Sequence, residues 1–328
     1  MTETTAMRLL AGLARVRDDQ LRGAVDSPVA QALLREIVRV DVAPARGRRR
    51  RRLLHVAAAG AAAASLAVAV LVGTRGHETP TASAATLLKH TAKIARAQPP
   101  LALGAGQYVY TRSRDVSAAV TVVGGSTFAA LEPHSRETWL NAAGNGRLHT
   151  VTGQPTFITE RDRAAWIAAG RPQISTPGAH DDVLHGMPRV EIPTDPDRAY
   201  AQLERKTAAF GAAQYTEMFT LVGDNLRETT ATPEQRAALY AVAARIPGVE
   251  LLGPAVDPAG RRGVAVAMDD AARHIRQTLI FDPATSRLLA EQEIALSGSQ
   301  EFPAGTRIES AVYLETAIVD SAGERPAR

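Results

Sequence analysis

The residues best suited to chemistry are few and scattered along this chain. Of eight histidines, only His180 and His185 lie close together, in the segment HDDVLH with Asp181 and Asp182 between them. Imidazole and carboxylate groups can bind a transition metal. However, these residues fall in a proline-flanked stretch, residues 172–196, with no further ligands nearby. We therefore predict no metal site, and we expect no cofactor.

Sequence motifs of common enzymes are missing. There is no Gly-x-Ser-x-Gly elbow, Walker A loop, Rossmann fingerprint or His-Glu-x-x-His. The chain has no cysteine, which excludes disulfides, thiolate metal sites, a cysteine nucleophile and a lipid-modified cysteine anchor. Two acidic pairs, Asp269 with Asp270 and Glu291 with Glu293, are interpreted as solvated surface. We expect no enzyme activity, unless a catalytic set converges only in the folded structure.

Aromatic residues offer one candidate binding site. Tyr108, Tyr110 and Trp139 fall in strand-like segments and could line an apolar ligand pocket in a curved sheet, together with Phe128 and Trp166. The alternative, which is the commoner outcome for aromatic residues on strands, is that they form part of the core.

The basic charge of the chain is concentrated in one place. The sequence pI is about 9.7, but from residue 82 onward there are 25 Lys and Arg against 27 Asp and Glu. The excess of basic residues comes from one block that directly precedes residue 53: Arg46, Arg48, Arg49, Arg50, Arg51 and Arg52. A compact block of this kind does not form a basic groove, so we predict no nucleic-acid binding.

Residues 53–73 read LLHVAAAGAAAASLAVAVLVG and carry no charge. At about 1.5 Å per helical residue, such a segment spans a hydrocarbon layer of roughly 30 Å. Because the arginine block precedes the span and Arg75 alone follows it closely, the N-terminus is predicted to be cytoplasmic. The arginines Arg48 to Arg52 are expected to anchor the chain on anionic membrane lipids. A cleaved export signal, with Arg50 to Arg52 as a twin-arginine motif and cleavage at Ala82-Ser83-Ala84, is an alternative with poor spacing.

The cytoplasmic segment contains one amphipathic pattern, at residues 27–40. Pro28 lies in its first turn, and Leu33, Leu34 and Ile37 share one face. Such a helix could bind a cytoplasmic protein partner, or it could pack on its neighbour or on the bilayer surface.

Beyond a linker at residues 74–81, the pattern predicts one domain over residues 82–328. Ser83 is expected to cap a helix over residues 84–97, and residues 172–196 are expected to be a loop. Strands are predicted at residues 107–116, 120–128, 135–140, 147–151, 156–159, 249–252, 263–268, 275–281, 288–295 and 307–319, and helices at 197–210, 215–227 and 233–245. Strands, then helices, then strands favour an α+β fold with a curved, half-barrel-like antiparallel sheet and helices packed on one face, preceded by one transmembrane helix.

Several phrases carry a family resemblance. They are the strand at residues 108–112, RETW at 136–139 followed by GNGR at 144–147, IPTDP at 192–196, RAALY at 236–240 running into IPGV at 246–249, and LIFDP at 279–283. Together they resemble an actinobacterial family of single-pass membrane proteins without assigned function, often encoded beside genes for extracytoplasmic-function sigma factors. More loosely, the outer domain is similar in layout to lipoprotein-carrier half-barrels, an analogy of fold only.

The leading interpretation is a membrane-tethered extracytoplasmic binding or sensing module that contacts a lipid, a cell-wall fragment or a protein. The alternative is a regulator of a cytoplasmic partner, such as a sigma factor, acting through Leu33, Leu34 and Ile37. Specific capture of a sigma factor by residues 1–45 would favour the alternative.

Overall fold

The structure is a computed structural model that describes residues 81–187, 190–227, 231–298 and 302–327. All of them belong to a compact unit over residues 69–328. The predicted membrane span at residues 53–73 lies outside the described residues. Among the helices that are described, none is both long and apolar enough to cross a membrane.

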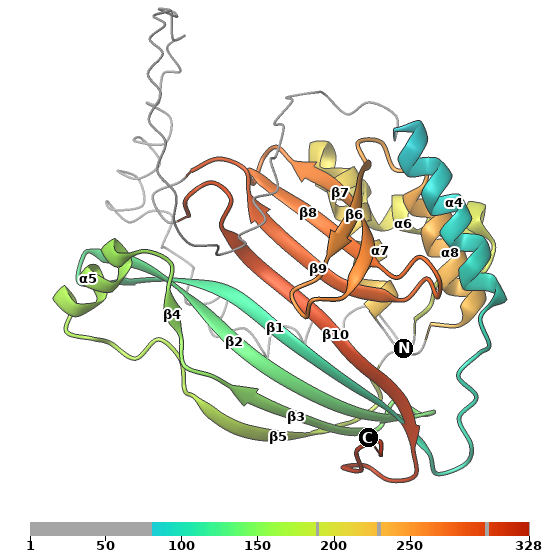
Figure 1. Cartoon of the computed structure of the whole chain (residues 1–328), viewed down its shortest axis with the longest axis horizontal. Helices are drawn as coiled ribbons and strands as arrows, with labels where there is room; N and C mark the ends of the chain where they lie inside the picture. Colours follow the sequence, from blue (N-terminus) through green and yellow to red (C-terminus); the bar gives the residue numbers. More distant parts are fainter. Residues whose placement is uncertain (1–80, 188–189, 228–230, 299–301, 328) are drawn as a thin grey trace, which may run out of the picture. The chain divides into compact units, whose positions relative to one another are not determined.

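One ten-stranded antiparallel sheet organises the described residues (Figure 1). The strand order is β5-β3-β2-β1-β10-β9-β8-β7-β6, and β4 pairs with β2 off this path. The first and last long strands therefore lie side by side at the centre of the sheet. The strands are β1 (Tyr108–Val123), β2 (Ser126–Asn141), β3 (Gly146–Thr152), β4 (Thr156–Phe157), β5 (Gly178–Leu184), β6 (Glu250–Val256), β7 (Arg262–Asp270), β8 (Ile275–Phe281), β9 (Leu288–Ala295) and β10 (Arg307–Val319).

Helices pack beside the C-terminal half of this sheet (Figure 1). They are α4 (Ala82–Ala97), α6 (Pro196–Thr207), α7 (Gln214–Arg227) and α8 (Pro233–Ala243), with a 3-10 segment η1 (Ala208–Ala213) before α7; a short helix, α5 (Glu160–Ala168), packs on β2. The main core lies between this layer and the sheet, where Leu88, Leu203, Leu239 and Phe281 are almost completely buried. Burial of each such side chain contributes about 1.5–3 kcal/mol. The α+β prediction, an antiparallel sheet with helices packed beside it, is confirmed.

The helix starts follow local capping signals. The Thr232 side chain and Gln235 form a capping box at the start of α8, with Pro233 in the first turn. At α4 the predicted cap was wrong: the Thr81 hydroxyl, not that of Ser83, accepts from the Ala84 N–H at 3.3 Å. Thr81 lies three residues before that N–H, whereas Ser83 already lies inside the first turn.

The first three predicted strands are in fact one long hairpin. β1 and β2 run unbroken to a turn at Gly124 and Gly125, whose φ angles of 56° and 80° suit glycine. Pro133 does not break β2, because it lies between the residues that pair with β4 and those that pair with β3. A proline without an N–H is tolerated in such a gap in the ladder.

The predicted loop at residues 172–196 was wrong in part, because it contains β5. This edge strand pairs with β3 from Gly178 to Leu184, although nearly all of its side chains are exposed. Backbone pairing and the contacts of Asp181 with Arg147 and His149 join it to β3, so its sequence shows no alternation of apolar residues. Helix α5 was also missed, although its Thr159 and Asp162 form a capping box.

Candidate functional site

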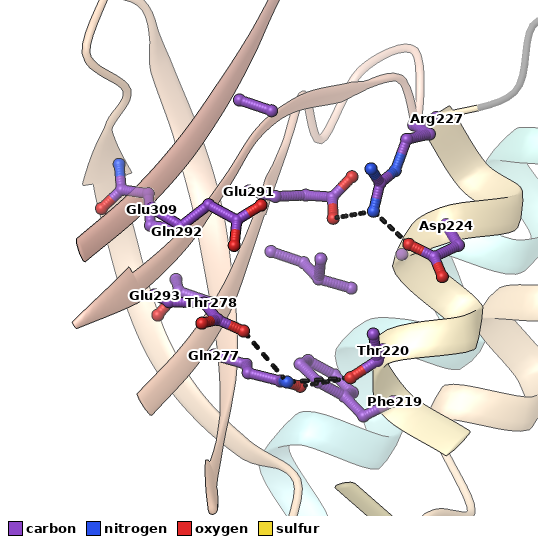
Figure 2. A pocket seen from close by; sticks show the side chains of 13 residues that line it. Phe219, Thr220, Asp224, Arg227, Gln277, Thr278, Glu291, Gln292, Glu293 and Glu309 are labelled. Carbon is purple, nitrogen blue, oxygen red and sulfur yellow. Dashed lines mark hydrogen bonds and ion pairs between the residues drawn. The ribbon is translucent and has the colours of Figure 1, made fainter. Parts of the chain in front are cut away.

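A polar hollow of about 230 Å³ lies between α7 and strands β8, β9 and β10 (Figure 2). Its wall is built from one helix and three consecutive strands, and the helix is far from the strands in sequence. The lining residues are Phe219, Thr220, Gly223, Asp224, Arg227, Gln277, Thr278, Leu279, Glu291, Gln292, Glu293, Glu309 and Ala311.

The helical wall comes from one face of α7. Thr220, Gly223, Asp224 and Arg227 are spaced by three and four residues, so their side chains share one face of the helix. The first turn is acidic and the last turn basic, with Glu217 and Arg227 complementing the helix dipole. Local sequence therefore determines which α7 residues can face the sheet together.

The sheet wall follows from strand register. Gln277 pairs with Glu293, which pairs with Glu309, so the three side chains form one row across β8, β9 and β10. The next row contains Glu291, and through Ala311 it reaches Asp115 on β1. Paired residues in adjacent strands point to the same face of a sheet. Acidic residues from β1, β9 and β10 are thereby brought onto the face that α7 covers.

Gly223 lets α7 come close to the sheet. A Cβ atom at this position would lie 2.9 Å from Glu291 Oε2 and 3.1 Å from a methyl group of Leu279. Both distances are shorter than normal contacts, so a larger residue would displace the helix or the Glu291 side chain. The glycine therefore sets the width of the hollow.

Glu291 is the central group of the hollow. The Tyr313 hydroxyl donates a hydrogen bond to its Oε1 at 2.7 Å, and Arg227 Nη2 lies 3.3 Å from its Oε2. Arg227 also pairs with Asp224 (Figure 2). Burial raises the pKa of Glu291, while the charge of Arg227 and the Tyr313 hydrogen bond act in the opposite direction.

Glu293 lies in the row of Gln277 and Glu309, and its partners differ from those of Glu291. Arg273 Nη2 lies 3.1 Å from one of its oxygens, and the Gln277 amide donates to the other at 3.4 Å (Figure 2). Gln277 in turn hydrogen-bonds to Thr220 on α7. Burial raises the pKa of Glu293, with Glu309 adding to the effect.

The lining is strongly unbalanced in charge. Its carboxyl groups belong to Asp224, Glu291, Glu293 and Glu309, whereas Arg227 is the one basic residue among these lining side chains. Burial also raises the pKa of Asp224. Partly desolvated carboxylates that outnumber their counter-charges favour a cationic group or take up protons.

The same lining offers no serine or cysteine nucleophile paired with a histidine base. Threonine supplies its only hydroxyl groups, and no histidine, serine or cysteine is among its residues. Acyl transfer of the kind that uses a triad needs such a set. Within the described parts of the chain, no group of three or more His, Cys, Asp or Glu residues is arranged to hold a metal ion.

The predicted aromatic residues lie elsewhere. Tyr110 and Trp139 are buried and pack with ring centroids 5.4 Å apart, and the half-buried Tyr108 packs against them. Trp139 Nε1 donates to the Glu324 carbonyl, so the C-terminal segment contacts this cluster. Tyr110, but not Trp139, borders a second polar hollow, beside Glu137. A ligand role for the three residues stays a prediction.

Other predicted residues cannot be placed. Arg48, Arg49, Arg50, Arg51 and Arg52, and the partner-helix residues Leu33, Leu34 and Ile37, all lie outside the described residues. The same holds for the boundaries of the cytoplasmic segment and of nearly all of the linker.

Sequence reasoning missed the residues of the hollow. Glu291 and Glu293 were interpreted as solvated, which is wrong, since their side chains are only 18% and 17% exposed. Their spacing of two on a strand did place them on one face. A signal was therefore present, but the helix that covers this face could not be read from local sequence.

Comparisons with known proteins leave the family open. No family model and no curated protein matches this chain. It is similar to a crystal structure of MucB, with 14% identity and a TM-score of 0.28, covering 76% of this chain and 62% of that one. The match to the Pseudomonas aeruginosa MucA/MucB complex has 13% identity and a TM-score of 0.26, and it covers 75% of this chain and 59% of that one. The match to a DUF1329 family protein from Desulfovibrio piger has 7% identity and a TM-score of 0.18, and it covers 71% of this chain and 91% of that one. The chain spans less than two thirds of the length of the MucB chains.

Proposed function

We propose that this chain is a membrane-tethered extracytoplasmic binding module, without catalytic activity of its own, whose hollow beneath α7 receives a cationic group of its ligand. The observation that carries the proposal is the charge imbalance of that hollow, where four carboxyl groups are matched by two guanidinium groups, Arg227 in the lining and Arg273 beside Glu293. Three of the four carboxyl groups have a pKa raised by burial. A bound cation would relieve this cost.

The size of the hollow limits what enters it. A volume of about 230 Å³ is below the roughly 300–1,000 Å³ that is typical of pockets enclosing whole drug-sized ligands. We therefore propose that only one group of a larger ligand enters, a primary ammonium or a guanidinium. A cell-wall peptide, a lipid headgroup and a protein side chain can all present such a group.

The topology belongs to the same proposal. Residues 53–73 form the span, Arg48 to Arg52 hold its cytoplasmic end on anionic lipids, and the domain from residue 82 lies outside with a half-barrel curvature. Support comes from the uncharged length of the span and the asymmetry of its flanking charge. Alkaline phosphatase fused to the C-terminus should then be active, because this enzyme needs an oxidising compartment; activity of a cytoplasmic reporter instead would contradict the topology.

Binding can be tested with a matched pair of small probes. N-acetyl-arginine amide should raise the unfolding temperature of the detergent-solubilised full chain, whereas its citrulline counterpart, which has the same shape without the charge, should not. The variant Glu309→Gln should lose this response, because Glu309 is an exposed lining carboxylate whose replacement leaves the core intact.

A control variant separates the hollow from general charge. Glu250→Gln removes an exposed carboxylate from β6, outside the hollow, and should respond as the wild type does. Equal shifts with arginine and citrulline probes, or an unchanged response in Glu309→Gln, would refute the cationic site. Native mass spectrometry of the full chain purified from membranes then identifies whether the retained ligand is a lipid, a cell-wall fragment or a protein.

A further inference from the structure

The end of the β1–β2 hairpin is free of charge. Residues 116–131, VSAAVTVVGGSTFAAL, contain no Asp, Glu, Lys or Arg, in a chain of which 22% is charged. Asp115 and Glu132 mark the two sides where charge resumes. We call this stretch the hairpin end. Its composition is not that of an ordinary solvent-exposed hairpin, which usually carries charged residues that block association.

The hairpin end presents apolar side chains to its surroundings. Val122 is 69% exposed and Val120 is 44% exposed, and by their spacing of two they lie on one face of β1. Val123 is exposed on the other face. The pairing of β1 with β10 stops at Ser117, so beyond it one edge of β1 has no neighbouring strand among the described residues. Such an apolar strand end indicates a contact surface.

Helix α5 is fixed to the same end of the sheet. The Asp162 carboxylate accepts from the Ala129 N–H at 2.9 Å, and Trp166 packs on Phe157 of β4 with ring centroids 5.1 Å apart. α5 leaves Ile167 46% exposed. The helix therefore extends the apolar surface of the hairpin end.

The charge around this surface is mainly basic. Arg161 and Arg163 on α5, and Arg171 just after it, are exposed, whereas Asp162 is buried in the capping box and Glu160 is the exposed acid of this helix. Exposed arginines beside exposed apolar residues are a pattern of interfacial membrane-binding segments. This charge complements anionic lipid headgroups and disfavours a second copy of the same surface.

We infer that the hairpin end and α5 contact the anionic lipid surface of the membrane that holds the chain. This inference rests on the proposed tether. In Figure 1, α4 starts near the top of the view and descends, whereas β1 runs toward the left of the view, where the hairpin end lies beside α5. The contact is confined to the headgroup level, because the unpaired backbone edge of β1 needs water or headgroups as partners.

The absence of cysteine makes a clean test possible. Val122→Cys and Val256→Cys each introduce a single labelling site for the environment-sensitive fluorophore NBD in the full chain. Val256 is a matched control, because it is a valine 56% exposed on the edge strand β6, separated from β1 by four strands in the sheet order and outside the hairpin end. Both labelled chains are reconstituted into vesicles of equal parts phosphatidylcholine and phosphatidylglycerol.

Nitroxide-labelled lipids should quench emission from residue 122 and leave emission from residue 256 unchanged. The double variant Arg161→Gln and Arg163→Gln should reduce the quenching while its circular dichroism stays that of the wild type. Absence of quenching at residue 122, in chains that float with the vesicles, would overturn the inference and leave the tether intact. Protection of residue 122 that appears only at high protein density would instead identify a second copy as the partner. A chain that does not float would refute the tether and the inference together.

Discussion

Replacing Arg227 with glutamine tests whether the hollow holds a partly buried, counter-charged carboxylate. In the structure, Arg227 Nη2 lies 3.3 Å from Glu291 Oε2, and the two side chains are 37% and 18% exposed. The substitution removes the positive charge and keeps a polar side chain. Glu291 then retains its hydrogen bond from Tyr313 but loses its counter-charge.

The expected coupling energy follows from distance and exposure. Coulomb attraction at 3.3 Å with an effective dielectric constant of about 20 is roughly 5 kcal/mol, which is an upper bound before desolvation. Exposed pairs contribute at most about 1 kcal/mol, whereas breaking a buried pair costs about 3–5 kcal/mol. The exposure of Arg227 places this pair nearer the lower value, so we expect a coupling of about 1–2 kcal/mol.

The stability lost in Arg227→Gln should depend on pH, and the pKa of Glu291 sets the direction of that dependence. Burial holds the pKa of Glu291 above its unfolded value, so the folded state binds more protons than the unfolded state and this group's contribution to stability falls as pH rises through that range. Without Arg227 the pKa rises further. The penalty of Arg227→Gln should therefore be small at about pH 5 and larger at about pH 8.

Urea unfolding of the wild type, Arg227→Gln, Glu291→Gln and the double variant at both pH values measures the coupling directly. Arg245→Gln is the matched control, because Arg245 pairs with an Asp197 that is 86% exposed. Because Arg245 also lies over the Tyr200 ring at 4.3 Å, its loss should be about 1 kcal/mol or less, and equal at both pH values. A loss for Arg227→Gln that is equal at both pH values, or additive with that of Glu291→Gln, would refute the reasoning.

Three further predictions concern the rest of the fold. Arg325→Gln removes the bidentate partner of Glu137, at 2.8 and 2.6 Å, and should cost about 1 kcal/mol at neutral pH because Arg325 is 65% exposed. Since Arg325 lowers the pKa of Glu137, this stability is present above the unfolded pKa and lost as pH falls, and acid titration of the variant should show a flatter dependence. Asp162→Ala leaves the buried Ala129 N–H without its acceptor and removes a cap, so hydrogen exchange at Ala129 should accelerate and stability fall by about 1–3 kcal/mol. Leu203→Ala empties a fully buried site in the main core and should cost about 2–5 kcal/mol in denaturant unfolding.

Local sequence determined the elements whose signals are local. The cap at Thr232 with Pro233 and the three-and-four apolar spacing along α7 are such signals, and the predicted α7, α8 and β9 lie close to their observed bounds. Each signal lies within a few residues of the structure it specifies, because capping and amphipathic periodicity act over one or two turns. For the same reason, the spacing of Glu291 and Glu293 was enough to place both on one face.

Only the tertiary structure decided which groups meet. Residues 178–184 form a strand because their backbone pairs with β3. β1 pairs with β10 although about 200 residues separate them in the chain. In the same way, Arg227 reaches Glu291 only because α7 packs on β9, with Gly223 allowing the close approach. Register and packing between distant segments depend on the total burial of the fold, and no short stretch of sequence carries that information.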